Sequence, residues 1–588
     1  MKKVLVIDVL TRNKVKKSLC KYDEIWYLHE EGLKNSENKK IKCILDYKSK
    51  NQVFFQKENL ALQLCNDTYT ESLHKKLASL HTDLDNIEFI HKKYQANYLT
   101  DFHYASIIKI FIDELTSNNQ DIEVTYNNNH FLYSHKYPNN ICVIRKLRLK
   151  CILRKLLSLN LHFGFFMYKL LRMKHIESIP KLQEEFDVMF YFDRKGQEVE
   201  WKYILTKLSE KQKIIIYYHP LPLSKPVNNN DLNEILKFLK NENIICEVST
   251  VNDFEYITFK MKINYLLKGF TNYVNLLFDI INNFKYIDWY SKYFTIELDA
   301  IIYNNVLESI KTKRFITIGE YNPNLNLRTT MWKKNGSITE NVVHGLRIAS
   351  FENSFIYLDK IYIWDRVMEK DLKKMSSEIK EYVLTGPMYL HQIYDSPELN
   401  PFLPAKTIGI FSHDLEFVDL TSNWGNSNSK EHKKIFFEYI LNCAKKHRDY
   451  NFMIIPHPRE RQRGYLIEDF DCEMLKLPNV NIDFSESRFG SFRYIQNIDM
   501  GITMLSSIGF EMLFAGFKCI FFDYPQMNLS NYAEVYGDIF TNPSKFSMDE
   551  WSDFVILKAN QPKEAFFNQY NIPIYNKDSL INALLNEA

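Results

Sequence analysis

The sequence predicts an α/β protein with two doubly wound, Rossmann-like domains and a helix-elaborated N-terminal half. Short runs of β-branched and aromatic residues alternate with longer helical stretches along almost the whole chain, which indicates largely parallel sheets. Prolines at 387, 397, 401 and 404 mark a stretch, 390–405, that separates two such series and predicts an interdomain linker. At 588 residues, the chain is also too long for a single hydrophobic core.

In the first half, strands are predicted where an apolar or aromatic run is short and bounded by polar residues. These runs are KKVLVIDV (2–9), YDEIWYL (22–28), IKCILDY (41–47), DIEVTY (121–126), DVMFYF (187–192), KIIIYYH (213–219), IICEVS (244–249), RFITIGEY (314–321) and ENVVHG (340–345). Helical patterns lie between them, for instance over 103–117 and 260–285.

The second half has a cleaner pattern. It begins with KIYIWD (360–365) and YVLTG (382–386) around a helix predicted over 368–380. After the linker come the strands TIGIFS (407–412), FMIIPHP (452–458), VNIDFS (480–485), MGITM (500–504) and KCIFFDY (518–524), with helices over 430–448, 491–497 and 507–515. This pattern predicts one compact doubly wound unit, and in such units ligands bind beyond the carboxyl ends of the strands.

Composition excludes several classes of function. The net charge of +3 is small for this length, so wholesale nucleic-acid binding is not expected. The nine cysteines include no CxxC pair, which argues against a zinc site and against a disulfide framework. Asp8 interrupts the apolar N-terminal run, and no stretch reaches the ~18 apolar residues of a membrane span, so a cytoplasmic protein is expected.

Residues 145–174 are compositionally unusual. They contain nine Lys or Arg and no acidic residue, and Leu, Ile, Phe and Met fill much of the remainder. A basic amphipathic helix of this kind can lie on an anionic membrane surface, which would place the protein peripherally at the inner face of the membrane. The alternative is a helix that packs its apolar face on the protein's own core and leaves its lysines in solvent.

In the C-terminal series, a histidine is held rigidly at the tip of a buried strand. The run FMII ends at Pro456-His457-Pro458, and Arg459 follows directly. Proline removes a backbone donor and holds the preceding residue extended, so the two prolines fix the direction of His457. The alternative is a surface turn with an incidental histidine.

Two further strand ends of this series carry polar residues. The strand MGITM leads into Ser506-Ser507, where a helix begins, and the first turn of a helix binds phosphate through its free N–H groups. Glu511 follows about one turn later, within reach of a ribose. Ser412 and His413 lie on the loop after the first strand. Taken singly, Ser506 is equally well explained as an N-cap and Glu511 as a solvated helix residue.

In the N-terminal unit, three more sites are candidates. Glu320 follows the strand RFITIG and His344 follows ENVV, each beside a glycine that permits close backbone approach. Their alternatives are a turn carboxylate and a packed histidine. Asp193 and Glu198, after the strand DVMFYF, are candidates for a second carboxylate, or else belong to a solvated loop.

These motifs, in the order GE, VVHG, DKIYIWD, YVLTGP, IGIFS, IIPHPRE and SSIGFEMLFAG, resemble those of bacterial glycosyltransferases of the GT-B fold that assemble surface polysaccharides. The chain is similar in particular to enzymes that use CMP-activated ulosonic acids, namely Kdo transferases and bacterial sialyl- and polysialyltransferases. The resemblance covers about residues 310–530 and implies two Rossmann-like domains facing a cleft. It implies an acceptor and catalytic domain over 1–390 and a nucleotide-sugar domain over 405–588, whose final helix is a candidate for crossing back.

The resemblance also implies roles for single residues. His457, Ser506 and Ser507 would bind the donor phosphate, Glu511 the ribose, and the loop from Phe411 to His413 the base. Because a CMP-sugar has one phosphate, a histidine, Arg459 and a helix N-terminus suffice without a metal, and no cofactor is expected.

The catalytic assignment follows the retaining branch of this family. The inverting sialyltransferases carry an Asp-Asp/Glu-Gly motif that is not found here. In the retaining Kdo transferases a carboxylate nucleophile lies near the HG strand, which implies Glu320 in this chain, although aspartate is the expected residue. His344 would hold the donor's carboxylate or act as acid/base on the acceptor hydroxyl.

The expected reaction transfers an ulosonic acid from a CMP-sugar donor to a glycan or glycolipid acceptor. The alternatives are a UDP-sugar 2-epimerase-like enzyme, a polyol-phosphate transferase, and a non-catalytic scaffold for glycan assembly. The two enzymes share the two-domain cleft and similar strand tips, whereas the scaffold would keep the fold while its N-terminal site has decayed.

Overall fold

The structure is a computed structural model, and it describes residues 3–11, 21–31, 41–43, 53–69, 71–81, 102, 105–106, 108–113, 121–125, 141–143, 149–177, 185–194, 196–219, 228–282, 286, 289–290, 292–318, 325–345, 356–375, 377–394, 403–413, 429–466, 471–484, 490–504, 506–523 and 530–585. The chain divides into two compact units. The first comprises Met1–Asn341, Ser350–Lys360 and Met375–Glu381, and the second comprises Val342–Ala349, Ile361–Lys374 and Tyr382–Ala588.

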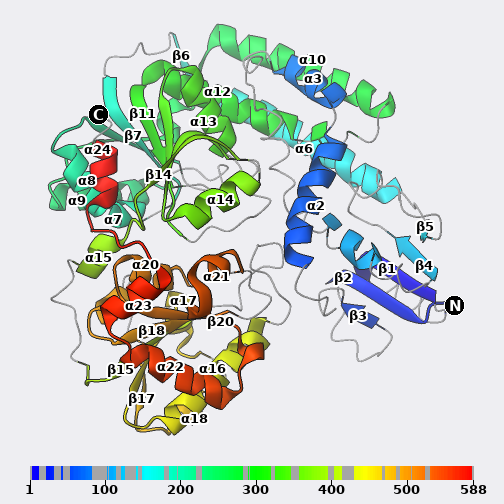
Figure 1. Ribbon diagram of the computed structural model, residues 1–588. Helices are drawn as coiled ribbons and strands as arrows, with labels where there is room; N and C mark the ends of the chain where they lie inside the picture. The colour runs from blue at the N-terminus through cyan, green and yellow to red at the C-terminus, as the bar shows by residue number, and fades with distance from the viewer. Residues whose placement is uncertain are drawn as a thin grey trace. The chain divides into compact units, whose positions relative to one another are not determined.

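The chain begins with a five-stranded parallel sheet in the order β3-β2-β1-β4-β5 (Figure 1). Its strands are β1 (Lys3–Thr11), β2 (Glu24–Glu31), β3 (Ile41–Cys43), β4 (Asp121–Thr125) and β5 (Ile141–Val143). Helices α2 (Val53–Thr68) and α3 (Glu71–Leu80) lie between β3 and β4 in the chain. This sheet is separate from the one that follows, so the strands predicted in the first half divide between two sheets.

A seven-stranded sheet follows, in the order β14-β13-β12-β11-β7-β8-β9. Its strands are β7 (Glu185–Phe192), β8 (Ile214–Tyr218), β9 (Glu247–Thr250), β11 (Lys311–Thr317), β12 (Ile338–Val342), β13 (Tyr357–Ile363) and β14 (Glu378–Leu384). β7 pairs in parallel with β8 on one side and with β11 on the other. The strands after β9 are therefore added on the opposite side of β7, and the switch point of the sheet lies between β7 and β11. All five residues of β8 are buried, as expected for a parallel strand covered on both faces.

Eight further α-helices of the described residues lie before or between these strands in the chain. They are α6 (Leu149–Arg172), α7 (Gln197–Glu200), α8 (Lys202–Ser209), α9 (Asn229–Asn241), α10 (Phe259–Asn282), α12 (Tyr293–Ser309), α13 (Leu325–Lys334) and α14 (Arg366–Lys374). The short strands β6 (Lys174–Ile176) and β10 (Tyr256–Thr258), which follow α6 and precede α10, pair in parallel with each other.

The second unit contains a six-stranded parallel sheet in the order β17-β16-β15-β18-β19-β20. Its strands are β15 (Thr407–Phe411), β16 (Asn451–Ile455), β17 (Val480–Ile482), β18 (Met500–Thr503), β19 (Cys519–Phe522) and β20 (Phe540–Thr541). In chain order this is 3-2-1-4-5-6, the Rossmann order, and its switch point lies between β15 and β18.

Besides α14, the helices of this unit are α15 (Leu390–Tyr394), α16 (Ser429–Lys446), α17 (Pro458–Arg463), α18 (Asp471–Met474), α19 (Phe492–Ile495), α20 (Ser507–Phe514), α21 (Ser530–Tyr536), α22 (Met548–Asn560), α23 (Lys563–Tyr570) and α24 (Ser579–Leu585).

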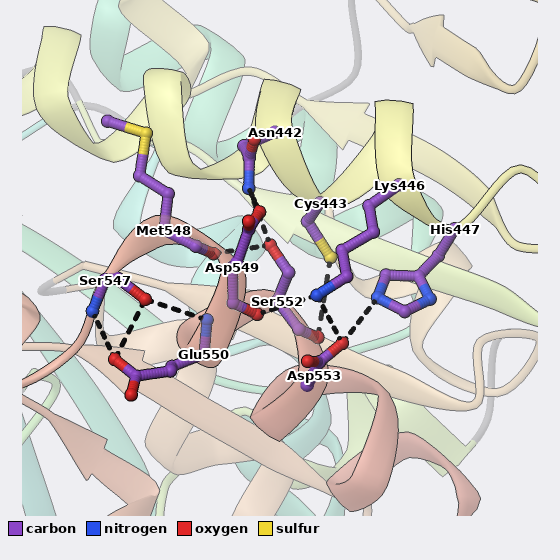
Figure 2. Close-up of polar contacts among 10 residues, drawn as sticks. All are labelled: Asn442, Cys443, Lys446, His447, Ser547, Met548, Asp549, Glu550, Ser552 and Asp553. Carbon is purple, nitrogen blue, oxygen red and sulfur yellow. Dashed lines mark hydrogen bonds and ion pairs between the residues drawn. The ribbon is translucent and has the colours of Figure 1, made fainter.

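Polar contacts join α16 to α22 at the surface of this unit (Figure 2). Lys446 forms an ion pair with Asp553 at 2.7 Å, and the Asn442 amide donates to Asp549 at 3.0 Å. The N-terminus of α22 is closed by a capping box, in which Ser547 and Glu550 each accept the other's backbone N–H. These contacts are structural and lie outside the predicted site.

The predicted fold class is confirmed: the chain is α/β, and its seven- and six-stranded sheets are Rossmann-like and doubly wound, as in the GT-B fold. The five-stranded sheet at the start of the chain has the same kind of strand order and was not predicted as a separate sheet. The domain limits 1–390 and 405–588 stay a prediction. The helix predicted over 368–380 is too long, because α14 ends at Lys374. Glu378 instead begins β14, and its N–H donates to the carbonyl of Ile356 at 2.9 Å, so strand pairing overrides the helical pattern.

We expect Gly509→Ala to destabilise the protein. A Cβ at Gly509 would lie 2.7 Å from Thr503 Cγ2 and 2.8 Å from the Phe521 ring, so α20 would have to move off the sheet, at a cost of about 1–3 kcal/mol. Gly164→Ala in α6 is the control, because nothing lies within 4 Å of its Cβ position and a helical alanine adds about 0.5–1 kcal/mol. Thermal unfolding of both variants checks this, and equal shifts would contradict it.

Candidate functional site

Three predicted strand tips come together at the carboxyl edge of the six-stranded sheet. β16 and β18 both pair with β15, one on each side, so the segments after these strands lie next to one another. His413 follows β15, His457 follows β16 and Ser506 follows β18. The His413 and His457 rings lie 5.6 Å apart between centroids. The sequence therefore predicted correctly that these motifs share one edge, beside the switch point.

His457 is the N-cap of α17, and this fixes its orientation. Its backbone is extended, with φ −61° and ψ 149°, and Pro458 occupies the first helical position. The backbone N–H of Arg459 donates to Nδ1 of His457 at 3.3 Å. Because Nδ1 is an acceptor, the ring proton of the neutral imidazole is on Nε2. The strand tip thus presents a histidine of defined tautomer with an Nε2–H donor.

Glu460 lies at the centre of the polar contacts behind His457. Its buried carboxylate accepts the backbone N–H of His457 at 2.7 Å and the hydroxyl of Ser412 at 2.9 Å. Lys433 of α16 forms a buried ion pair with this carboxylate and donates to the carbonyl of Leu466 at 2.6 Å. Burial raises the pKa of Glu460, and Lys433 acts in the opposite direction.

The three arginines after His457 have different surroundings. Arg461 is buried, and its Nε donates to the carbonyl of Pro456 at 2.9 Å, so it supports the strand tip from inside. Arg463 lies over the ring of Tyr465, at 5.3 Å from its centroid. Arg459 is exposed. The contact predicted between Arg459 and the donor phosphate stays a prediction.

The loop after β15 is mostly internal. Phe411 is buried as the last residue of the strand, and Ser412 is buried through its hydrogen bond to Glu460. His413 is only partly buried. Of the three residues predicted to touch the base, His413 is thus the most accessible, while Ser412 positions the loop.

Ser506 and Ser507 lie where the motif predicts them, at the start of α20. Ser506 is the N-cap, with φ −82° and ψ 138°, and its hydroxyl does not cap the helix. Both serines are partly buried. The tight approach of Gly509 to Thr503 and Phe521 holds this first turn against β18 and β19, which fixes the direction of its N–H groups.

Glu511 is more deeply placed than a solvated helix residue. Its side chain is 3% exposed, and burial raises its pKa to about 8. The carboxyl is therefore mostly protonated at neutral pH, and in that form it can both donate and accept a hydrogen bond.

The two predicted catalytic residues are Glu320 and His344, and the structure describes only His344. Glu320 lies outside the described residues. His344 is partly buried, and the strand end before it is tied to β13, since Val343 N–H donates to Tyr362 O and Trp364 Nε1 donates to Val343 O, each at 3.1 Å. It belongs to the same compact unit as His457.

Asp365, at the end of β13, is a carboxylate that sequence reasoning missed. It caps α14 by accepting the Met368 N–H at 2.9 Å, and it accepts the Tyr536 hydroxyl at 2.8 Å. Burial raises its pKa to about 6. Its place after KIYIW was visible in the sequence, but nothing there distinguished it from an ordinary N-cap.

Asp193 and Glu198 lie at the carboxyl edge of the seven-stranded sheet, in the first unit. Glu198 is buried and accepts the Gly196 N–H at 2.9 Å, so it shapes its own turn. Asp193 is partly buried, and its N–H donates to Gln197 at 2.6 Å. Neither side chain lies in a solvated loop tip.

Beside them lies a buried aromatic and basic cluster that the sequence did not reveal. The guanidinium of Arg328 is fully buried and lies 3.8 Å from the centroid of the Tyr191 ring. Burial lowers the pKa of His219, after β8, to about 3, and neither of its ring nitrogens has a hydrogen-bond partner within the described part of the chain. In the part of the chain that the structure describes, no group of three or more His, Cys, Asp or Glu side chains has the geometry of a metal site.

Comparison with known proteins gives structural likenesses only. No family model matches the chain, and no curated protein matches it. The UDP-GlcNAc 2-epimerase from Neisseria meningitidis, bound to UDP-GlcNAc, is 11% identical and covers 68% of this chain and 100% of its own, with a TM-score of 0.40.

Two further solved structures are similar at the same level. The UDP-GlcNAc 2-epimerase from Methanocaldococcus jannaschii is 12% identical, covers 69% of this chain and 100% of its own, and has a TM-score of 0.42. The wall teichoic acid polymerase TagF is 14% identical, covers 75% of this chain and 99% of its own, and has a TM-score of 0.34.

Lys433→Met tests the buried contacts behind His457. The substitution leaves the Glu460 carboxylate buried without its cation, and we expect a loss of about 3–5 kcal/mol in the free energy of unfolding. Lys434→Met is the matched control, since this neighbouring lysine is exposed and its loss should change stability by no more than about 0.5 kcal/mol. Denaturant titration measures both, and a loss of similar size in the two variants would refute the role of the pair.

Glu511→Gln should change how stability depends on pH. The folded-state pKa, about 8, lies above the ordinary 4.5, so the folded protein keeps a proton that the unfolded chain loses, and wild-type stability falls as pH rises through this interval. Each unit of pKa shift corresponds to about 1.4 kcal/mol, so the advantage of the variant should grow from pH 5 to pH 8 and then level off.

Unfolding curves at pH 5, 7 and 9 for this variant measure the effect. Glu473→Gln, at an exposed glutamate of α18, is the control. A difference in stability between the wild type and the Glu511→Gln variant that stays constant with pH would show that the carboxyl is ionised in the folded protein.

Proposed function

We propose that this protein is a glycosyltransferase that transfers an ulosonic acid, Kdo or a sialic-like sugar, from a CMP-activated donor to a surface glycan or a lipid-linked acceptor. The observation that carries the proposal is the placement of His457. It is held at a strand tip with its proton on Nε2, beside His413 and next to the switch point of a Rossmann-ordered sheet. Switch points of such sheets are where nucleotides bind.

The groups at this edge suit a single phosphate. Nε2–H of His457 and the first-turn N–H groups of α20 are fixed donors, and Arg459 adds one exposed cation. Donors held in place by a cap and by a tightly packed helix lose little entropy when an anion binds. A diphosphate would favour further cations here, whereas Arg461 and Arg463 are engaged with Pro456 and Tyr465.

Glu511 suits the ribose. A protonated carboxyl can donate to one sugar hydroxyl and accept from the other, and Glu511 follows the first turn of α20, the turn proposed to bind the phosphate. The cytosine would then lie toward His413, the more accessible residue of the loop after β15.

For the chemical step, the resemblance in the sequence supports Glu320 as nucleophile. Its carboxylate would form a bond to the anomeric carbon as the bond to the CMP oxygen breaks, and the acceptor hydroxyl would then displace it. His344 would take the proton of that hydroxyl. The leaving phosphate would stay on His457 and the start of α20, which would stabilise the charge that develops on it.

A thermal-shift panel of CMP, CDP, UMP and UDP tests this function. CMP at about 100 times its dissociation constant should stabilise the protein by roughly 2.7 kcal/mol, because it binds only the folded state. His457→Ala should abolish the shift, and His447→Ala, a histidine on the α16–α22 surface, should retain it. Glu320→Gln should keep the CMP shift but lose transfer from a CMP-sugar.

Other outcomes of the panel favour the alternative functions. Stabilisation by UDP and UMP but not by CMP would overturn the CMP donor and favour an epimerase-like enzyme. A clear preference for CDP would favour a polyol-phosphate transferase. No shift with any nucleotide would favour a scaffold without a donor site.

A further inference from the structure

Two 24-residue helices of the first unit, α6 and α10, form a fixed pair (Figure 1). The rings of Phe163 and Tyr273 stack at 4.2 Å between centroids. At the end of α6, Lys262 Nζ donates to the carbonyls of Leu171 at 3.1 Å and Met173 at 3.3 Å. These contacts join α6 to α10 near the middle and at the end of α6.

The inner side of the pair belongs to the core of the unit. On α6, the side chains of Leu159, Phe166 and Leu170 are buried, and Phe166 packs against Phe294 of α12. On α10, Lys268 pairs with Glu297 of α12 at 2.7 Å. The alternative predicted for 145–174, in which one face packs on the protein's own core, therefore accounts for this inner side.

The outer side of each helix carries a stripe of exposed apolar side chains. Its residues follow one another at intervals of three or four along α6, or four, three and eight along α10, which keeps them on one face. The stripe on α6 consists of Leu153, Leu157, Leu161, Phe165, Tyr168 and Leu171, each 38–63% exposed. The stripe on α10 consists of Phe259, Ile263, Leu267, Phe270 and Phe278, each 40–66% exposed. We call these two stripes together the α6/α10 face.

The two helices are also strongly basic. α6 contains five Lys or Arg and no acidic residue, and α10 contains three lysines and one aspartate. Arg172, Lys174 and Lys260 are exposed near the ends of the stripes. Exposed leucines and phenylalanines bordered by cations fit the boundary between the headgroups and acyl chains of an anionic bilayer.

We propose that the α6/α10 face binds the surface of an anionic membrane, with both helices lying in its plane. None of the described helices has the length and apolar character to cross a bilayer, so binding takes place at the interface. A second copy of this chain fits less well, because a symmetric contact pairs a patch with itself and would oppose the two sets of cations. This inference does not depend on the proposed reaction.

Co-sedimentation of the full-length protein with vesicles tests the proposal. We expect binding to phosphatidylcholine vesicles that contain phosphatidylglycerol, and much weaker binding to phosphatidylcholine alone. Leu161→Gln with Leu267→Gln should lower the partition coefficient by about tenfold for each leucine. Arg172→Gln with Lys260→Gln should lower it by roughly fivefold for each cation, and only on the anionic vesicles.

The matched control is Ile245→Gln with Leu557→Gln, which removes two apolar side chains outside the face that are at least as exposed and should leave binding unchanged. Circular dichroism and the unfolding midpoint should be the same for every variant. Failure of the wild type to bind anionic vesicles would overturn the proposal, as would undiminished binding of the Leu161/Leu267 variant. A wild-type dimer in light scattering that this variant dissociates, without vesicle binding, would assign the face to a second copy instead.

Discussion

The buried carboxylate of Glu460 is the contact on which the candidate site depends. It joins the loop after β15 through Ser412, the tip of β16 through the His457 N–H, and α16 through Lys433. A carboxylate out of water is costly unless its oxygens are paired, so these three segments are held where they satisfy it. Because burial of the pair gains little net stability, its consequence is mainly positional: two adjacent strand ends are kept in register, and with them His413 and His457.

Within the described residues, the five-, seven- and six-stranded sheets follow the same strand order, and this explains where their polar residues gather. In each, the first strand lies in the interior and the fourth strand is its neighbour on the side opposite the second. The connections then leave in opposite directions, which opens a crevice at the carboxyl edge. In the six-stranded sheet this edge carries imidazoles and a helix start. In the seven-stranded sheet it carries Asp193 and His219, with Arg328 buried next to them, so two sheets carry polar groups at corresponding edges.

Much of the fold could be predicted from the sequence because buried parallel strands are short apolar runs bounded by polar residues. The site was partly predictable, since prolines around His457 and serines before α20 are local signals. Glu460 was not found, although its spacing from His457 is that of a capping box, because histidine is an uncommon cap and burial is not a local property. The exposed stripe of α10 was missed for a similar reason. An apolar stripe has the same sequence pattern whether it faces the core or the solvent, and only the packing of α10 on α6 decides which of its residues remain exposed.

The form of the motif around His457 suits the anion site that we propose there. A histidine on a mobile loop would lose rotational freedom on binding, and that loss would weaken the complex. Here the constraints are present beforehand: Pro458 sets the first helical φ, Glu460 holds the His457 N–H, and Arg461 holds the carbonyl of Pro456. Since the Arg459 N–H occupies Nδ1, the tautomer is set by the same short helix that sets the direction. The arginines of this segment therefore differ in their surroundings, although they look alike in the sequence. Arg461 supports the backbone from inside, and Arg459 is exposed to solvent.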